Sequence, residues 1–368
     1  MLKSAVIAAD SGIPGAEAAF SDFGEVRLLH ASEMHADSLS DTDILVVRSV
    51  REVGKALLQG TGIRLVCSAT AGLDHVDRTW LDEHGIEFRH APGANADSVA
   101  DYVMAVLLRF AEMDGMPTSM GVVGCGQVGT RVARRAEALG LLVLKNDPPR
   151  ARHEGGDGFH ALEELLATCD VVTLHTPLIR SGPDTTLRLI DAHRLASFRG
   201  WLFNTSRGPV VDGGALSKAL QRGTGPSRVA LDVWEAEPDP DPTLIDRVDV
   251  ATPHIAGYAA ESKWNATRMV TVAIAEFLGA PVPEPHPGLV QPDAVSGNGE
   301  TPANIAERIV RLNRDDRFLR GMSSGGSTFE DYRANYPGKR LGSSCAVSGV
   351  DAAVASTLTA ALGCRVQS

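Results

Sequence analysis

Short apolar runs alternate with amphipathic stretches along the first 280 residues of the chain. In the first ninety residues, five runs have the length and apolar continuity of buried strands: residues 4–9, 26–29, 43–47, 65–68 and 86–89. Several of these runs end in small polar residues and glycine. An open parallel sheet is therefore predicted, with ligand contacts at the carboxyl ends of its strands.

A second series of strands follows a long helical pattern. Val99, Val103 and Phe110 repeat near helical period within residues 96–113. Beyond this helix, five further apolar runs alternate with helical stretches: residues 120–123, 141–144, 171–174, 201–204 and 228–231. Such alternation is typical of a doubly wound domain. A second long helix over residues 261–278 is predicted to return the chain to the first domain.

The pattern predicts an α/β protein with two Rossmann-like, doubly wound parallel-sheet domains and a small C-terminal α+β domain. The first domain is discontinuous and comprises residues 1–96 and 256–280. A nucleotide-binding domain, residues 97–255, is inserted into it. Residues 281–302 are rich in proline and glycine and are predicted to be a linker, and residues 303–368 form the C-terminal domain.

Composition narrows the class of protein. The chain has 368 residues, 43% of them hydrophobic, and a formal net charge of −11, which argues against a nucleic-acid partner or an anionic membrane surface. Its five cysteines are widely spaced and include no C-x-x-C pair, so neither a disulfide framework nor a metal site is predicted. Without a signal segment or an apolar run of about 20 residues, a cytoplasmic protein with reduced thiols is expected.

The most specific motif follows the strand at residues 120–123. Gly124, Gly126 and Gly129 form G-x-G-x-x-G, which provides a tight turn, a close approach to a pyrophosphate and close helix–strand packing. The helix that follows offers free N–H groups to the phosphates. Asp147 lies 23 residues after Gly124, where an acid accepts the ribose 2′-hydroxyl, and no arginine follows directly to hold a 2′-phosphate. NAD is therefore favoured over NADP.

Three ionisable residues follow strands in the second half of the chain. Arg207 can bind a carboxylate with two hydrogen bonds, His254 can accept a hydroxyl proton, and Glu237 can fix the tautomer of an imidazole. Oxidation of a 2-hydroxy acid requires such a set. Taken singly, Arg207 and Glu237 are also typical of solvated loops, and His254 of a buried structural histidine.

Three stretches that contain these residues resemble the signatures of D-isomer specific 2-hydroxyacid dehydrogenases: residues 204–208, 231–238 and 252–257. The resemblance covers residues 1–280 and implies that Arg207 holds the substrate carboxylate, Glu237 partners the histidine and His254 transfers the proton. It also implies that Asp232 contacts the nicotinamide carboxamide. The other residues implied to bind the cofactor are Gln127, Val128, Thr176, Thr205, Ser206 and Gly257, with Arg207 among them.

Further stretches resemble one branch of that family, which oxidises 4-phospho-D-erythronate in vitamin B6 biosynthesis: residues 47–50, 69–77, 147–150, 175–178 and 254–258. The resemblance implies that Ser49, Thr70 and Tyr258 contact a phosphorylated 2-hydroxy acid, and that the C-terminal domain forms a homodimer. Arg48 is the candidate for the phosphate. The chain departs from the branch at residues 10–14, 67–68 and in its last sixty residues.

Two alternatives remain open from the sequence. One is a dehydrogenase for 3-phosphoglycerate or for hydroxypyruvate and glyoxylate, although residues 147–150 and the short C-terminal tail disfavour it. The other is an NAD(H)-sensing binding protein of the same fold, because such proteins can keep the Arg, Glu and His set. Fold alone does not decide between them.

Overall fold

The computed structural model describes residues 5–284, 291–322, 327–336 and 338–367. The chain forms two compact units. The first is Met1–Asn95 with Ala259–Val290, and the second is Ala96–Tyr258 with Gln291–Ser368. The C-terminal stretch, predicted as a domain of its own over residues 303–368, thus packs in one unit with the nucleotide-binding part.

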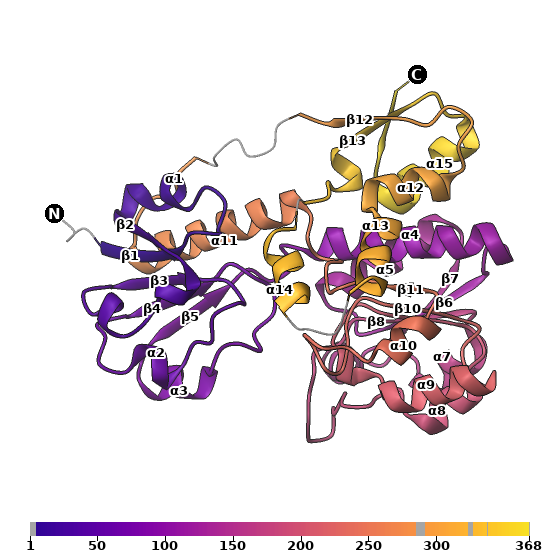
Figure 1. Cartoon of the computed structure of the whole chain (residues 1–368), viewed down its shortest axis with the longest axis horizontal. Helices are drawn as coiled ribbons and strands as arrows, with labels where there is room; N and C mark the ends of the chain where they lie inside the picture. Colours follow the sequence, from indigo (N-terminus) through magenta and orange to yellow (C-terminus); the bar gives the residue numbers. More distant parts are fainter. Residues whose placement is uncertain (1–4, 285–290, 323–326, 337, 368) are drawn as a thin grey trace. The chain divides into compact units, whose positions relative to one another are not determined.

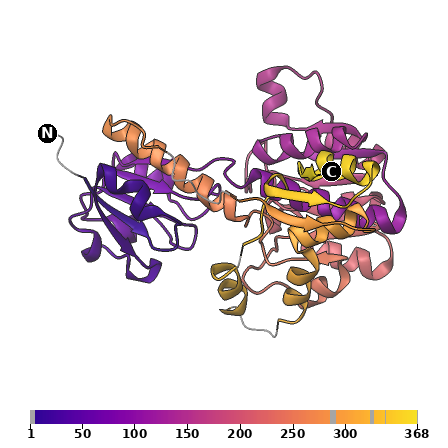
Figure 2. The ribbon, with the colours of Figure 1, turned by 90° about the horizontal axis from the view of Figure 1, so that it is seen from above.

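The first unit contains a five-stranded parallel sheet in the order β2-β1-β3-β4-β5. Its strands are β1 (Ala5–Asp10), β2 (Gly24–Leu29), β3 (Ile44–Val47), β4 (Leu65–Ser68) and β5 (Glu87–His90). Its helices are α1 (Ala16–Phe20), α2 (Lys55–Leu58), α3 (Arg78–Glu83) and α11 (Ala260–Leu278). Helices α2 and α3 lie on one face of the sheet (Figure 1), and α11 lies on the other (Figure 2). Leu57 and Leu81 pack in the core on the first face, and Val270 and Ile274 in the core on the second. Helix α11, which comes late in the chain, therefore covers one face of a sheet whose strands all lie in the first ninety residues.

The second unit contains a six-stranded parallel sheet in the order β11-β10-β9-β8-β6-β7. Its strands are β6 (Ser119–Val123), β7 (Leu142–Asn146), β8 (Val171–Leu174), β9 (Trp201–Asn204), β10 (Arg228–Leu231) and β11 (Val250–Ala251). The order reverses at β6, which has β7 on one side and β8 on the other. Ligands of open α/β sheets bind at such a reversal, and the glycine motif directly follows β6.

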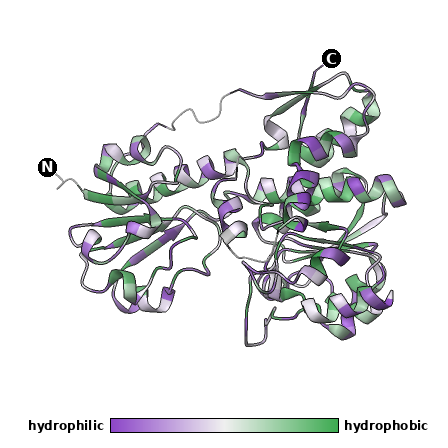
Figure 3. Cartoon of the chain, viewed as in Figure 1, coloured by the Kyte–Doolittle hydropathy of each residue, from purple (hydrophilic) through white to green (hydrophobic). Residues whose placement is uncertain are grey.

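Helices cover both faces of this second sheet. α4 (Ala96–Asp114) and α5 (Gln127–Ala138) lie in one core cluster with β6. The helices of the other cluster are α7 (Leu162–Thr168), α8 (Ala192–Ser197), α9 (Gly213–Arg222) and α10 (Pro242–Arg247). Apolar residues gather in the strands between these layers (Figure 3). No helix in the described ranges is long and apolar enough to cross a membrane.

The C-terminal segment adds a small three-stranded parallel sheet of β12 (Asp293–Ser296), β13 (Cys345–Ser348) and β14 (Arg365–Gln367) (Figure 1). Its helices are α12 (Pro302–Val310), α13 (Leu312–Arg320), α14 (Ser327–Ala334) and α15 (Ala352–Leu362). α12 and α15 pack on α4 and α5 in one continuous core. The buried carboxylate of Asp101 on α4 accepts hydrogen bonds from Arg135 of α5 and from the N–H of Gly342, so polar contacts also join these parts.

The predicted fold class is confirmed, and the differences are local. The stretch predicted as a linker, residues 281–302, contains the exposed strand β12. The strand was not predicted because the prolines and glycines of this stretch are typical of a loop. α6 (Pro148–Glu154), α10 and α13 were not predicted, because they are short or carry few apolar residues at helical spacing.

Lys339 is a buried lysine in the C-terminal segment. Only 1% of the residue is exposed, and its Nζ has no hydrogen-bond partner within the described part of the chain. The ammonium lies 5.4 Å from the centre of the Tyr102 ring. Burial lowers its pKa from 10.5 to about 8, although the nearby carboxylates of Asp232, Asp315 and Asp101 raise it.

Replacing Lys339 with methionine is expected to stabilise the protein at pH 7. Between pH 8 and pH 10.5 the unfolded chain holds more protons on this group than the folded protein, so the stability of the wild type rises with pH there. Below pH 8 the Lys339 ammonium is charged in both states, and burying that charge lowers the free energy of unfolding by on the order of 3 kcal/mol. Urea unfolding at pH 7 and pH 9.5 should show a gain for Lys339→Met that shrinks at the higher pH. The exposed lysine variant Lys55→Met is the control; a loss of stability for Lys339→Met at pH 7 would contradict this account.

Candidate active site

The glycine motif has the geometry that a pyrophosphate requires. Gly124 has a φ of +85°, and a Cβ there would lie 2.7 Å from the carbonyl oxygen of His175. A Cβ on Gly129 would lie 1.9 Å from the carbonyl oxygen of Gly124, so this glycine allows α5 to pack closely on the turn. A Cβ on Gly126 would meet no atom within 4 Å. Space for a ligand therefore lies beside Gly126, at the N-terminus of α5, where Gln127 and Val128 form the first turn.

Asp147 follows β7 at the same edge of the sheet. Its carboxylate accepts hydrogen bonds from the N–H groups of Cys125, at 2.8 Å, and Arg150, at 3.1 Å. The guanidinium of Arg150 is bound to both carboxylate oxygens of Glu154 and to the carbonyl of Cys125. The acid expected to bind a ribose hydroxyl is thus in place, and the nearest arginine is engaged, which fits NAD rather than a 2′-phosphate.

Thr176 and Thr205 lie after β8 and β9 as predicted. Thr176 Oγ1 is buried and has no hydrogen-bond partner among the residues that the structure describes, so this orphaned hydroxyl fits a cofactor contact. Thr205 Oγ1 lies 3.2 Å from Nδ1 of His175, whose Nε2 lies 3.0 Å from Thr173 Oγ1. Burial lowers the pKa of His175 to about 3, so this histidine is neutral and serves to order the two strand ends.

The turn that carries Arg207 is tied to the end of β9. Asn204 accepts hydrogen bonds from the N–H and hydroxyl of Ser206 and donates one to the carbonyl of Arg207. A Cβ on Gly208 would lie 1.9 Å from the carbonyl atoms of Trp234. The turn after β9 therefore packs directly against the loop after β10, which leads to Glu237.

Glu237 and His254 form the central polar contact of the site. Oε2 of Glu237 lies 2.7 Å from Nδ1 of His254, and its Oε1 accepts a hydrogen bond of 2.9 Å from the N–H of Trp234. Because Nδ1 of His254 faces a carboxylate, the proton belongs on that nitrogen, and Nε2 is left for a substrate. Burial raises the pKa of Glu237, but the charge and hydrogen bond of His254 and the Trp234 N–H outweigh it, so the pKa is lowered.

His254 has a φ of +57°, in the left-handed region that a β-carbon disfavours. Such a conformation persists only where the surroundings impose it. Here Asp232, 1% exposed, accepts hydrogen bonds from the hydroxyl of Thr252 (2.6 Å) and from the N–H groups of Ile255 (2.9 Å) and Ala256 (2.8 Å). Burial raises the pKa of Asp232, while His254 and these hydrogen bonds lower it; burial prevails.

The other residues of this loop and its support come from several elements. Gly257 and Tyr258 follow Ala256 and are half-buried. Tyr102 of α4 was not predicted to take part, yet its hydroxyl lies 2.7 Å from Thr252 Oγ1. Arg333 of α14 was also missed, although its guanidinium lies 5.8 Å from the centre of the Tyr258 ring. No local sequence signal marks these two residues, because their contacts are long-range.

Three predicted substrate contacts lie in the first unit, at the carboxyl ends of β3 and β4. Arg48 forms an ion pair of 2.9 Å with Asp10, whose side chain is fully buried. Gly12 leaves room for this guanidinium, since a Cβ there would lie 2.3 Å from Arg48 Nη2 in its present position. Ser49 is exposed, and Thr70 Oγ1 lies 2.8 Å from Ser68 Oγ.

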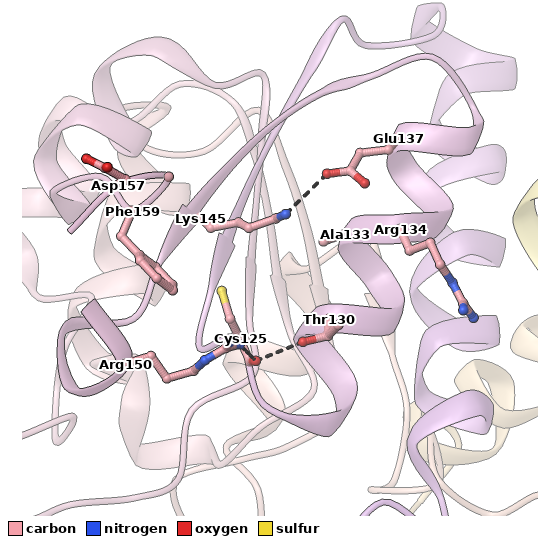
Figure 4. A pocket seen from close by; sticks show the side chains of 10 residues that line it. Cys125, Thr130, Ala133, Arg134, Glu137, Lys145, Arg150, Asp157 and Phe159 are labelled. Atoms are coloured by element: carbon pink, nitrogen blue, oxygen red, sulfur yellow. Dashed lines mark hydrogen bonds and ion pairs between the residues drawn. The ribbon is translucent and has the colours of Figure 1, made fainter. Parts of the chain in front are cut away.

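A pocket of about 310 Å³ lies beside the glycine turn, between α5, β7 and the segment after Arg150 (Figure 4). Within it, Thr130 donates a hydrogen bond to the carbonyl of Cys125, and Lys145 pairs with Glu137 at 3.3 Å. None of the residues predicted to bind the cofactor lines this pocket. Two of the residues that line it, Cys125 and Arg150, donate backbone hydrogen bonds to Asp147.

Comparison with known proteins agrees with this geometry. The family model "D-isomer specific 2-hydroxyacid dehydrogenase, NAD binding domain" matches residues 107–256. An erythronate-4-phosphate dehydrogenase of Salinibacter ruber is 46% identical over 92% of this chain and 93% of its own. The protein of that name from Edwardsiella ictaluri is 43% identical over 96% of this chain and 97% of its own.

The chain belongs to the erythronate-4-phosphate dehydrogenase family. The resemblance seen in the sequence is thereby confirmed. Among solved structures, D-lactate dehydrogenase from Aquifex aeolicus in complex with NAD and lactic acid is 25% identical, with a TM-score of 0.60 over 74% of this chain and 95% of that chain. The TT0316 protein of Thermus thermophilus is 27% identical, with a TM-score of 0.61 over 76% of this chain and 99% of that chain. Members of the erythronate-4-phosphate dehydrogenase family thus match nearly the whole chain, and these two solved structures match about three quarters of it.

Two alanine substitutions in the glycine motif should have different effects. Gly126→Ala adds a methyl group in open space, so the protein should fold normally but bind NAD much more weakly, because the methyl group occupies the pyrophosphate position. Gly129→Ala places a methyl group 1.9 Å from a backbone oxygen and should destabilise the fold itself. Thermal unfolding and NAD titration of both variants separate the two effects. Normal NAD affinity in Gly126→Ala would show that the pyrophosphate lies elsewhere.

Proposed function

We propose that the protein oxidises C2 of 4-phospho-D-erythronate with NAD, giving (R)-3-hydroxy-2-oxo-4-phosphooxybutanoate in the biosynthesis of pyridoxal 5′-phosphate (vitamin B6). The observation that carries this function is the 2.7 Å contact between Glu237 and His254 at the end of a dinucleotide-type sheet. Relatives named erythronate-4-phosphate dehydrogenase match more than nine tenths of the chain, and their name is the basis for the proposed substrate. The predicted NAD cofactor is confirmed by the family model.

When bound, NAD would supply the acceptor for the hydride of C2. Asp147, Thr176 and the backbone around Gly126 would hold it, since these residues offer a carboxylate, an orphaned hydroxyl and open space. The further predicted cofactor contacts are Gly124, Gln127, Val128, Gly129, Thr205, Ser206, Arg207, Asp232 and Gly257.

His254 is proposed as the general base. Its Nε2 accepts the proton of the substrate hydroxyl, while Nδ1–H donates to Glu237 throughout. Glu237 carries a lowered pKa, so it stays ionised and stabilises the imidazolium that forms. Arg207 is proposed to bind the substrate carboxylate through its planar guanidinium.

Substrate contacts in the first unit and the assembly of the protein complete the proposal. Ser49, Thr70 and Arg48, with Tyr258 of the second unit, are proposed to contact the phosphorylated 2-hydroxy acid. A homodimer formed through residues 303–368 and a cytoplasmic location are also proposed, on the resemblance and the composition. No partner other than this small molecule and a second copy of the chain is proposed.

The direct test follows NADH formation at 340 nm with several acids. 4-Phospho-D-erythronate should give the highest kcat/KM, well above those of 3-phosphoglycerate, glycerate and lactate. With the best substrate, His254→Ala should lower kcat by roughly 10²- to 10⁴-fold, because general-base assistance is lost. An exposed histidine variant, His35→Ala, is the control. A clear preference for 3-phosphoglycerate would refute the substrate, and near-normal kcat in His254→Ala would refute the mechanism.

A further inference from the structure

Arg333 brings a positive charge from the C-terminal segment to the loop that carries His254. The residue lies on α14, and its guanidinium is 5.8 Å from the centre of the Tyr258 ring and 5.7 Å from that of Phe329. Tyr258 ends the loop, and its N–H donates to the carbonyl of Ile255 at 2.9 Å. Two aromatic rings therefore seat the guanidinium against the loop.

The ion pair of Arg333 is one that an incoming anion can replace. Its Nη1 donates to Glu330 Oε1 at 3.0 Å, and the Glu330 side chain is 48% exposed. Water can therefore solvate the Glu330 carboxylate once the ion pair is broken, whereas the largely buried guanidinium needs another anion in its place. Arg333 itself is only 15% exposed, and its buried Nε has no hydrogen-bond partner in the described ranges. A phosphate could take up this donor and displace the Glu330 carboxylate at little cost.

The charge of Arg333 affects the pKa of Glu237, which contacts His254. Burial lowers the pKa of Arg333, but the nearby Tyr258, Glu330 and Glu237 outweigh burial and raise it, so the guanidinium stays protonated. In turn, Arg333 is among the groups that lower the pKa of Glu237. The charges of Arg333 and Glu237 thus favour one another, and Glu237 is the carboxylate that contacts His254.

Arg48, the phosphate ligand predicted from the sequence, is held more firmly by its ion pair with Asp10. Its partner Asp10 is fully buried, and withdrawing the guanidinium would leave an uncompensated buried carboxylate. Arg333 has only the exposed Glu330 as its carboxylate partner at ion-pair distance among the described residues. The cost of turning toward a phosphate is therefore lower for Arg333.

We propose that Arg333 binds the phosphate group of the substrate and sets the preference for phosphorylated 2-hydroxy acids. This inference rests on the proposed function and adds to it a residue from the C-terminal segment. Arginine suits the role because its planar donors match the oxygens of a phosphate.

The test compares 4-phospho-D-erythronate with D-erythronate, which lacks the phosphate. Arg333→Met should lower kcat/KM for the phosphorylated acid by on the order of 10- to 100-fold, mainly through KM, since charge-assisted hydrogen bonds of this kind are lost. The weak activity on D-erythronate should fall far less. Arg333→Lys should restore part of the loss, and Glu330→Gln, which removes the competing carboxylate, should keep or lower the KM for the phosphorylated acid. Arg317→Met, at an exposed arginine of α13, is the control.

A second readout does not depend on turnover. Inorganic phosphate titrated calorimetrically into the NAD-bound protein should bind to the wild type and to Glu330→Gln, and at least tenfold more weakly to Arg333→Met. Equal losses of kcat on both acids would assign Arg333 to the support of Glu237 and overturn the proposal, as would unchanged phosphate binding in Arg333→Met. If the wild type prefers another acid altogether, the proposed function fails, and the phosphate titration still decides the role of Arg333.

Discussion

The carboxylate of Asp232 accepts hydrogen bonds from one hydroxyl and two backbone N–H groups, and the shape of the catalytic loop depends on this arrangement. Thr252, Ile255 and Ala256 provide the three donors, on both sides of His254. With its chain fixed before and after, His254 is held at a positive φ and its ring meets Glu237 at 2.7 Å. Burial makes each of these bonds costly to lose, because the groups have no water to replace them. Asp232, which the resemblance predicts to contact the nicotinamide carboxamide, thus also anchors the loop that carries His254.

The C-terminal segment supports the strand that leads into this loop. Asp316 of α13 accepts a hydrogen bond of 2.7 Å from the N–H of Ala251 on β11. Arg320 pairs with Asp316 and donates to the carbonyls of Ile245 and Val248. After α14, Tyr336 packs edge-on against Tyr258, with ring centres 5.8 Å apart. The segment therefore belongs structurally to the active-site unit, whatever further role it has in assembly.

Sequence reasoning succeeded where the determinants are local. Gly124 and Gly129 need their glycines for reasons set by neighbouring atoms, and the apolar runs of the two large sheets have the length of buried strands. It also placed Glu237 and His254 at the ends of strands that prove to be linked, because parallel strands bring their carboxyl ends to one edge. Helix α13 was not predicted because its sequence is mostly charged, and its burial against β11 comes from tertiary contacts. Arg333 could not be found from the sequence, since its partner Tyr258 lies far away along the chain.

Hydrogen exchange of the Ile255 and Ala256 amides in Asp232→Asn tests the role of the anchor most directly. An asparagine has one oxygen in place of two, so at least one of the three donors must lose its acceptor, at a local cost of about 1–3 kcal/mol. Exchange of at least one of these two amides should accelerate by roughly 5- to 150-fold while the strands of the sheet keep their protection. Unchanged protection of both amides, with only a weaker affinity for NAD, would show that Asp232 serves the cofactor and that the loop holds His254 by other means.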